Sequence, residues 1–258
     1  MKRFTDWFSL EGKKAIVTGG TRGLGYGMAE GLSRAGADVV IIGTTKKAWE
    51  SAEKLGQAAG RPVRAVVGDL SVEQDTPAIY KAAREALGGR ADILVNCAGI
   101  QYRCRAEDFP LEQWNRILAL NLSAVFRMSQ LAARDMLERG WGRIINVASM
   151  TSFFGSEMIP AYAASKGGVA QLTKACSNEW AARGVTVNAI APGYMETKLT
   201  SDMKEKNPAQ YAEVTGRIPM HRWGTAEDLQ GITVFLAGNA SAYITGAVIP
   251  VDGGYLGK

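Results

Sequence analysis

The hydrophobic positions of this chain form short apolar runs that alternate with longer amphipathic stretches. Apolar runs rich in β-branched residues are typical of parallel strands covered on both faces. The predicted strands are Lys14–Thr18, Asp38–Ile42, Val63–Val67, Asp92–Asn96, Arg143–Val147, Thr186–Ile190 and Ala247–Val251. The predicted helices are Tyr26–Ala35, Lys46–Ala59, Glu73–Leu87, Leu111–Arg139, Ala161–Ala182 and Thr225–Leu236. This alternation predicts an α/β fold, a doubly wound parallel sheet with helices on both faces.

The alternation continues through the whole chain, so we expect residues 1–258 to form a single domain. The polar segment at 195–217 interrupts it, between the sixth strand and the last helix. A long insertion at the rim where strands end is typical of a lid over a substrate site. A surface helix without function is the alternative.

A glycine-rich segment follows the first predicted strand and precedes a helix. Glycines at such a turn let the backbone approach a pyrophosphate closely, and the helix N-terminus offers N–H donors to it. In this position the segment predicts a dinucleotide site. The residues that we expect to contact the cofactor here are Gly19, Thr21, Arg22, Gly23, Leu24 and Gly25.

The second predicted strand ends without the acidic residue that binds the ribose 2′-hydroxyl of NAD. Thr44, Thr45, Lys46 and Lys47 stand there instead. Lysines at a helix N-terminus oppose the helix dipole, so they are better placed facing an anion. With Arg22, this segment favours the 2′-phosphate of NADP(H). A solvated lysine pair beside an NAD(H) site is the alternative.

Two further strand ends carry residues suited to the cofactor. Asp69 and Leu70 follow the third strand, where they can reach an adenine edge. Asn96, Ala98 and Gly99 end the fourth strand in mostly small residues, which let a cofactor lie against the backbone. In a parallel sheet these ends meet at one edge, so we expect one continuous site.

A tyrosine and a lysine four residues apart provide the candidate chemistry. Tyr162 and Lys166 share one face of a predicted helix, and Ser149 lies upstream at the end of a strand. An ammonium beside a phenol favours the phenolate, so we expect Lys166 to lower the pKa of Tyr162. Such a phenol can exchange a proton with a substrate alcohol or carbonyl, with Ser149 hydrogen-bonded to the same oxygen.

Composition excludes several other classes of protein. No apolar run approaches the ~20 residues of a membrane span, and the N-terminus does not resemble a signal peptide, so we expect a cytoplasmic protein. A net charge of +5 is spread along the chain, without the dense basic patch of a nucleic-acid surface. Three cysteines and one histidine without ligand spacing predict neither a disulfide framework nor a metal site.

Together these motifs resemble the short-chain dehydrogenase/reductase family over essentially the whole chain. The matching residues are Thr18–Gly25, Asp69, Asn96–Gly99, Asn121, Ser149, Tyr162–Lys166, Pro192, Gly193, Thr197 and Asp252–Gly254. The resemblance implies a Rossmann-type fold, a nicotinamide cofactor, a homotetramer and a catalytic set of Asn121, Ser149, Tyr162 and Lys166. It implies that Asn121 kinks its helix and holds a water of a proton relay, and that Pro192, Gly193 and Thr197 border the nicotinamide.

Several segments also resemble the sugar-acid branch of that family, which includes 2-dehydro-3-deoxy-D-gluconate 5-dehydrogenases and gluconate 5-dehydrogenases. Arg103 matches an arginine of that branch, and a guanidinium can bind a carboxylate through two hydrogen bonds. We therefore expect a small sugar acid as substrate, bound by Arg103 and lined by Ser149, Met150, Tyr162 and Tyr194. A 3-oxoacyl-carrier-protein reductase and a nucleotide-sensing protein without turnover are the alternatives.

Overall fold

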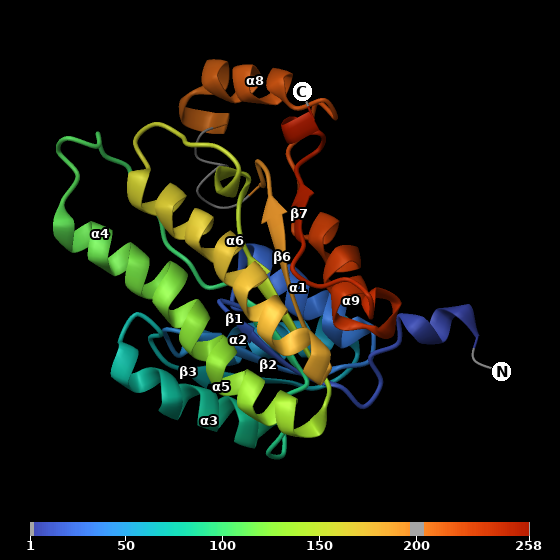
Figure 1. The fold of residues 1–258 in the computed structure, drawn as a ribbon. Helices are drawn as coiled ribbons and strands as arrows, with labels where there is room; N and C mark the ends of the chain where they lie inside the picture. The colour runs from blue at the N-terminus through green and yellow to red at the C-terminus, as the bar shows by residue number, and fades with distance from the viewer. Residues whose placement is uncertain (1–2, 197–203, 258) are drawn as a thin grey trace.

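The computed structural model describes residues 3–196 and 204–257, and its centre is one parallel β-sheet. Figure 1 shows the strands running side by side through the middle of the molecule. Seven strands pair in the order β3-β2-β1-β4-β5-β6-β7. Their bounds are β1 Lys14–Thr18, β2 Asp38–Gly43, β3 Val63–Val67, β4 Ile93–Asn96, β5 Gly142–Val147, β6 Val185–Pro192 and β7 Val248–Val251. The predicted fold class and all seven predicted strands are confirmed.

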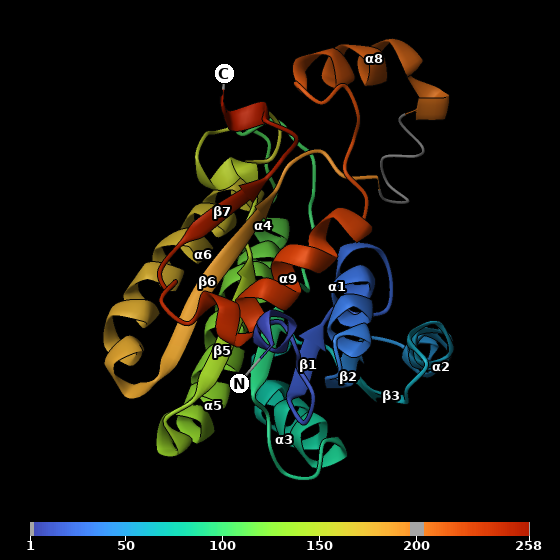
Figure 2. The same cartoon turned by 90° about the vertical axis from the view of Figure 1, so that its right-hand side faces the viewer.

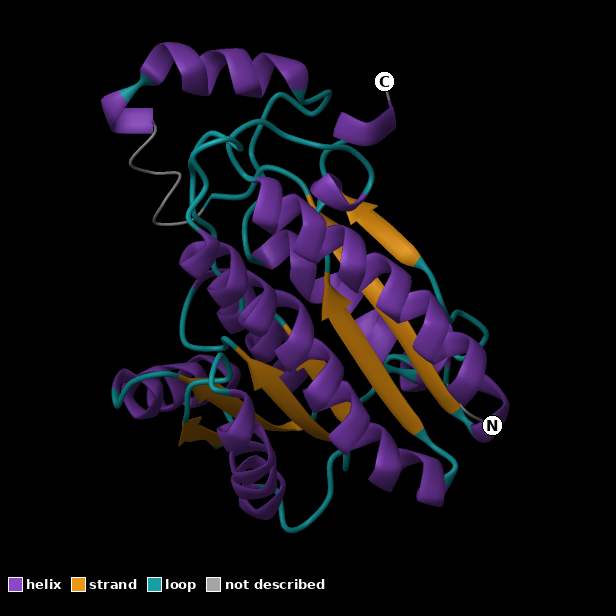
Figure 3. Cartoon of the chain, turned by 60° about the vertical axis from the view of Figure 1, so that its left-hand side comes forward, coloured by secondary structure: helices purple, strands orange, loops and turns teal. Residues whose placement is uncertain are grey.

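Helices cover both faces of the sheet, as the view in Figure 3 shows. Alternate residues of a strand point to opposite faces, and Val17 accordingly joins one core layer and Ile16 the other. The first layer packs under α1, α2 and α9, and the second under α3, α5 and α6. The helices are α1 Gly23–Arg34, α2 Lys47–Ala59, α3 Thr76–Ala86, α4 Leu111–Leu118, α5 Ala124–Arg139, α6 Pro160–Trp180, α8 Pro208–Arg217 and α9 Gln230–Ala237.

The strand order changes direction at the centre of the sheet, and this places the site. β1 pairs with β2 on one side and with β4 on the other. The connection that follows β1 therefore leads towards one edge of the sheet, and the connection that follows β4 leads towards the other edge. A crevice opens at such a switch point, outside the carboxyl ends of the strands. The glycine-rich loop follows β1, and the segment at 97–99 follows β4, so both border this position.

The helix predicted at Leu111–Arg139 is present but is not regular throughout. A π-helical turn at Ala119–Ser123 separates α4 from α5. Such a turn inserts one extra residue into the helical ladder and is frequent at functional sites. This π-helical turn contains Asn121, where the resemblance to the family implies a kink.

The segment predicted as a lid contains helix α8. Figures 1 and 2 show α8 beyond the carboxyl ends of the strands, apart from the helices that cover the sheet. None of its residues is buried. Across 3–196 and 204–257, no helix is long and apolar enough to cross a membrane.

Candidate active site

Strand β5 and helix α6 bring Ser149, Tyr162 and Lys166 together. Ser149 caps a short 3₁₀ turn after β5, and its Oγ accepts a hydrogen bond from the Thr151 amide at 3.1 Å. The Ser152 hydroxyl of the same turn donates to the Lys166 carbonyl oxygen at 2.7 Å. The turn and the helix are thereby fixed to each other, which sets the position of the hydroxyl relative to the phenol.

The electrostatics of the tyrosine differ from the sequence-based expectation. Burial raises the pKa of Tyr162, while the hydrogen bond with Ser149 lowers it. Lys166 does not oppose the rise, because its pKa of about 8 leaves it neutral at the pH where the phenol titrates; its Nζ donates to the Val147 carbonyl oxygen at 2.5 Å and lies 5.7 Å from the phenol ring centroid. The expected lowering by Lys166 is therefore wrong for this arrangement, and Tyr162 is a protonated donor at neutral pH.

Lys166 is itself an unusual lysine. Its side chain is buried, and burial lowers its pKa to about 8. The charged form is disfavoured because the surroundings cannot solvate it as water does. A lysine with this pKa can release and regain a proton near neutral pH, which suits a group that passes protons to and from a neighbouring phenol.

The buried side chain of Asn121 holds the loop that follows β4. Its Oδ1 accepts from the Ile100 amide at 2.9 Å, and its Nδ2 donates to the Ile100 carbonyl oxygen at 2.9 Å and to Ser165 Oγ at 3.3 Å. Its side chain thus links the loop to α6. The π-turn places this amide where one side chain reaches both elements.

The glycine-rich loop closes tightly between β1 and α1. Gly19 adopts φ +67°, a left-handed conformation that favours glycine. A Cβ at Gly25 would lie 2.4 Å from the Gly19 carbonyl oxygen, so only glycine fits there. No side chain caps the N-terminus of α1, which follows Arg22. The amides of its first turn are therefore left to an anionic ligand, and the loop fits a pyrophosphate.

The Thr18 side chain fixes the base of this loop, and the sequence analysis did not predict this contact. Its buried Oγ1 accepts from the amides of Cys97 and Ala98, both at 3.0 Å. The hydroxyl thus ties the end of β1 to the segment after β4. A threonine ending a strand was the only signal, and nothing local reveals partners 79 and 80 residues away.

The residues expected to bind the 2′-phosphate gather at the end of β2. Arg22, Thr44, Thr45, Lys46 and Lys47 are all exposed. A Cβ at the neighbouring Gly43 would lie 2.3 Å from Thr21 Cγ2, so this strand end touches the glycine-rich loop. Within the described residues no carboxylate forms an ion pair with Arg22, Lys46 or Lys47. They form a positive surface suited to a phosphate.

Other predicted cofactor residues divide into exposed and inward-facing groups. The exposed Asp69 carboxylate accepts from the Ser71 amide and hydroxyl at 2.9 and 2.7 Å. Leu70 is buried in the core, and the Asn96 side chain donates to Ser129 and Asn146 inside the molecule. Leu70 and Asn96 can therefore offer only backbone atoms to a cofactor.

The residues predicted to bind substrate lie on both sides of the catalytic turn. Arg103 is exposed on the loop after β4. A 2.9 Å hydrogen bond from the Cys104 amide to the Met158 carbonyl oxygen joins this loop to the segment that precedes α6. Tyr194, after β6, packs edge-on against Tyr255 at 5.4 Å. Met150, the residue after Ser149, is buried.

At the end of β6, Pro192 is buried and Gly193 lies against β7, since a Cβ there would be 2.7 Å from Asp252 Cα. Thr197 lies outside the described residues.

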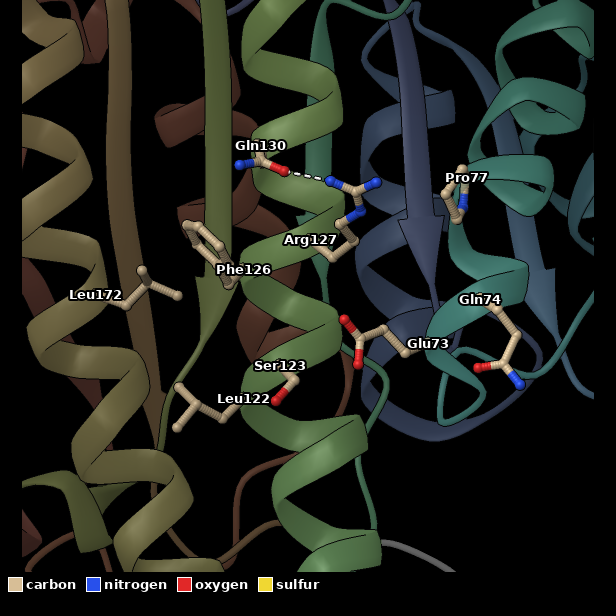
Figure 4. A pocket seen from close by; sticks show the side chains of 9 residues that line it. All are labelled: Glu73, Gln74, Pro77, Leu122, Ser123, Phe126, Arg127, Gln130 and Leu172. Atoms are coloured by element: carbon tan, nitrogen blue, oxygen red, sulfur yellow. Dashed lines mark hydrogen bonds between the residues drawn. The ribbon is translucent and has the colours of Figure 1, made fainter.

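A separate hollow of about 690 Å³ lies on the outer side of α5. Figure 4 shows its lining, with Arg127 hydrogen-bonded to Gln130. Its lining contains none of the predicted site residues. In the part of the chain that the structure describes, no cluster of histidine, cysteine, aspartate and glutamate is suited to a metal ion.

Fold and site together define a class of oxidoreductase. A family model described as enoyl-(acyl carrier protein) reductase matches residues 19–256. The chain belongs to the short-chain dehydrogenase/reductase family and is an NAD(P)-dependent oxidoreductase.

The chain is similar to several particular members of this family. It is 46% identical over 254 residues to 2-dehydro-3-deoxy-D-gluconate 5-dehydrogenase of Bacillus subtilis (strain 168), with 98% of each chain covered. It matches the crystal structure of a gluconate 5-dehydrogenase from Burkholderia cenocepacia J2315 in complex with NADP and tartrate at 37% identity and TM-score 0.92, covering 99% and 100% of the two chains. A 3-oxoacyl (acyl-carrier-protein) reductase of Agrobacterium tumefaciens C58, with NADP bound, matches at 30% identity and TM-score 0.92, covering 98% of each chain.

Proposed function

We propose that this enzyme transfers a hydride reversibly between NADP(H) and a ketone or secondary alcohol of a sugar acid of the gluconate type. One observation carries the proposal: the hydrogen-bonded Ser149–Tyr162 pair and the exposed guanidinium of Arg103 stand on the same rim of the sheet. A proton donor beside a carboxylate-binding group suits a substrate that carries both a carbonyl and a carboxylate. The similarity to sugar-acid dehydrogenases supports this substrate class over acyl thioesters.

The side chains of the site handle the proton, and the nicotinamide supplies or accepts the hydride. In the reducing direction Tyr162 donates its phenolic proton to the carbonyl oxygen, which becomes the alcohol. The Ser149 hydroxyl donates a hydrogen bond to the same oxygen and stabilises the charge that develops on it. Lys166 returns a proton to the phenolate, for which its lowered pKa of about 8 is suited. In the oxidising direction each proton moves the opposite way.

NADP(H) is the proposed cofactor, with NAD(H) as the weaker alternative. The exposed cations at the end of β2 support this, since each charge-assisted contact to a phosphate can contribute about 1.5–3 kcal/mol. The solved gluconate 5-dehydrogenase named above holds NADP. The residues proposed to hold the cofactor are Gly19, Thr21, Arg22, Gly23, Leu24, Gly25, Thr44, Thr45, Lys46, Asp69, Leu70, Asn96, Ala98, Gly99, Tyr162, Lys166, Pro192, Gly193 and Thr197.

A substrate panel tests this function directly. We expect the purified enzyme to turn over gluconate or 2-dehydro-3-deoxygluconate, with kcat/KM at least about tenfold higher for NADP(H) than for NAD(H), a difference of ~1.4 kcal/mol. A 3-oxoacyl thioester is the comparison substrate. Turnover of the thioester but not of the acids would assign the enzyme to acyl reduction, and binding of NADP(H) without any turnover would indicate a nucleotide sensor.

We also propose a homotetramer that works in the cytoplasm, without nucleic-acid or membrane partners. The exposed face of α5 supports self-association, because Phe126 is 44% exposed beside the hollow of Figure 4. Glu73 and Arg127 both line this hollow, so a two-fold axis can pair Glu73 of each copy with Arg127 of the other. Free cysteines at positions 97, 104 and 176 support a reducing compartment.

A further inference from the structure

Two cations lie against one tryptophan ring at the rim of the sheet opposite the active site. Lys13 immediately precedes β1, and its Nζ is 3.6 Å from the centroid of the Trp141 ring. The guanidinium carbon of Arg143, near the start of β5, lies 4.5 Å from the same centroid. Both cations stand at the amino ends of parallel strands, whereas Ser149 and the glycine-rich loop follow the carboxyl ends. This cluster is therefore separate from the cofactor site.

The register of the sheet brings the two cations to one face. Arg143 is level with Ile93 of β4, which is level with Ala15 of β1. Alternate residues of a strand share a face, so Lys13, two residues before Ala15, lies on this face as well. Lys13 and Arg143 can be no farther apart than their two distances to the ring centroid combined. An oxyanion that accepts charge-assisted hydrogen bonds of about 2.8 Å on two sides can bridge such a separation.

Arg143 is a buried charge without a counter-ion. Its residue is only 4% exposed, yet it forms no ion pair with any carboxylate of the described residues. Its Nε and Nη1 donate to the carbonyl oxygens of Gly238 and Gly142, at 3.4 and 2.9 Å. Its Nη2 donates to no described group and is not among the fully buried unpaired atoms, so this nitrogen reaches the surface. Burial lowers the pKa of Arg143, as expected for a charge that water solvates poorly.

The nearby carboxylate of Asp92 is already engaged by other groups. It accepts hydrogen bonds from the Lys14 amide and from Arg90 Nε, both at 3.1 Å, and it pairs with Arg139 at 3.4 Å. Burial lowers the pKa of Lys13, and the charges of three neighbouring arginines lower it further, whereas Asp92 raises it. Positive charges thus outnumber the carboxylate at this rim, and an anion would offset the excess.

We propose that Lys13 and Arg143 bind a phosphate group beside the Trp141 ring, at a site distinct from the cofactor site. One oxygen of the group accepts from Lys13 Nζ and another from Arg143 Nη2, because a guanidinium stacked on a ring keeps the donors in its plane available. The group would supply the counter-ion that Arg143 lacks, in a place where burial strengthens the attraction. By joining the start of β1 to β5 across β4, it would also stabilise the folded state.

Equilibrium dialysis with radiolabelled inorganic phosphate, at constant ionic strength, measures this binding directly. Saturating NADP⁺ is present in every sample, so that the proposed 2′-phosphate surface is occupied. We expect the wild type to bind one phosphate per chain at this site, and Lys13→Met to weaken this binding at least about tenfold through the loss of a charge-assisted hydrogen bond. Lys81→Met is the matched control, because Lys81 is exposed on α3, where it pairs with Glu85 at 3.8 Å. This control should bind phosphate as the wild type does.

Thermal unfolding with and without phosphate gives a second readout that includes the buried arginine. Arg143→Met is compared only with itself, because loss of a buried side chain changes stability without any ligand. Phosphate should raise the melting temperature of the wild type and of Lys81→Met by at least about 2 °C and leave those of Lys13→Met and Arg143→Met unchanged. An equal rise in all four proteins, or a wild type that binds no phosphate, would overturn the proposal.

Competition identifies the source of the phosphate group. Displacement of the label by glycerol 3-phosphate would support a site for phosphorylated metabolites, and displacement by orthophosphate alone would support a site for free phosphate. Gluconate that displaces the label equally well would assign the label to the proposed substrate site and overturn the proposal. None of these measurements needs turnover, so their outcome does not depend on the proposed function.

Discussion

At the scale of single residues, burial rather than charge pairing controls the two titrating groups of the site. Tyr162 has a raised pKa and Lys166 a lowered one, and burial is the largest cause in both cases. Each group is thereby held in its neutral form over a wider pH range. With a pKa of about 8, Lys166 still carries its proton in most molecules at pH 7, so it can return that proton to the Tyr162 phenolate, and this transfer neutralises both charges inside the protein.

The lowered pKa of Lys166 predicts how stability depends on pH. The folded-state pKa is about 8 and the ordinary value is 10.5, so between these values the unfolded chain binds more protons. The free energy of unfolding should therefore rise with pH in this window, by about 1 kcal/mol between pH 7 and 9. Urea unfolding of the wild type and of Lys166→Met, at both pH values, isolates this contribution.

The comparison with Lys166→Met removes the effects of groups that do not interact with Lys166. Burial raises the pKa of Cys97 and of Cys176 to about 11, and both thiols are present in the two proteins, but the charge of Lys166 lowers the pKa of Cys97 and so couples this thiol to the substitution. Their contribution has the opposite sign, and it sets in only above about pH 8.5, where unfolded thiols lose their protons. The same pH dependence in wild type and variant would show that Lys166 is normally solvated.

At the scale of secondary-structure elements, much of the fold could be predicted from sequence, because buried parallel strands are almost continuously apolar. The seven strands differ from their predicted bounds by no more than two residues at either end. The catalytic positions could be predicted for a related reason, since the end of β5 and the spacing of Tyr162 and Lys166 are local patterns. The apolar pattern also predicted one long helix at 111–139, and the resemblance to the family supplied its kink at Asn121.

The sequence did not predict the interactions between different secondary-structure elements. The Thr18 hydroxyl, the Asn121 contacts with Ile100 and the inward turn of Asn96 all depend on strands brought together by the sheet. The pKa of Tyr162 was predicted in the wrong direction for the same reason. The direction of the Lys166 side chain depends on the Val147 carbonyl, which no local spacing encodes.

At the scale of the whole molecule, the exposed face of α5 predicts assembly. We expect the wild type to elute as a tetramer, and Phe126→Glu to shift it to smaller species, because a buried carboxylate without a partner is strongly destabilising at an interface. Multi-angle light scattering measures the mass of both proteins. Trp49→Glu is the matched control, since Trp49 is 53% exposed on α2, away from α5. A monomeric wild type, or a tetrameric Phe126→Glu, would contradict this interface.

The central claim is that Tyr162 transfers the proton in an NADP(H)-dependent reaction on a sugar acid. The most direct measurement is kcat for the reduction of 5-dehydrogluconate by NADPH in Tyr162→Phe, with NADPH binding measured by fluorescence on the same preparation. Loss of the phenolic proton should lower kcat at least about 100-fold, the usual contribution of acid–base catalysis, and leave NADPH binding nearly unchanged. Tyr243→Phe, the same change on the exposed surface, should keep full activity. A Tyr162→Phe enzyme that keeps most of its kcat would contradict the account.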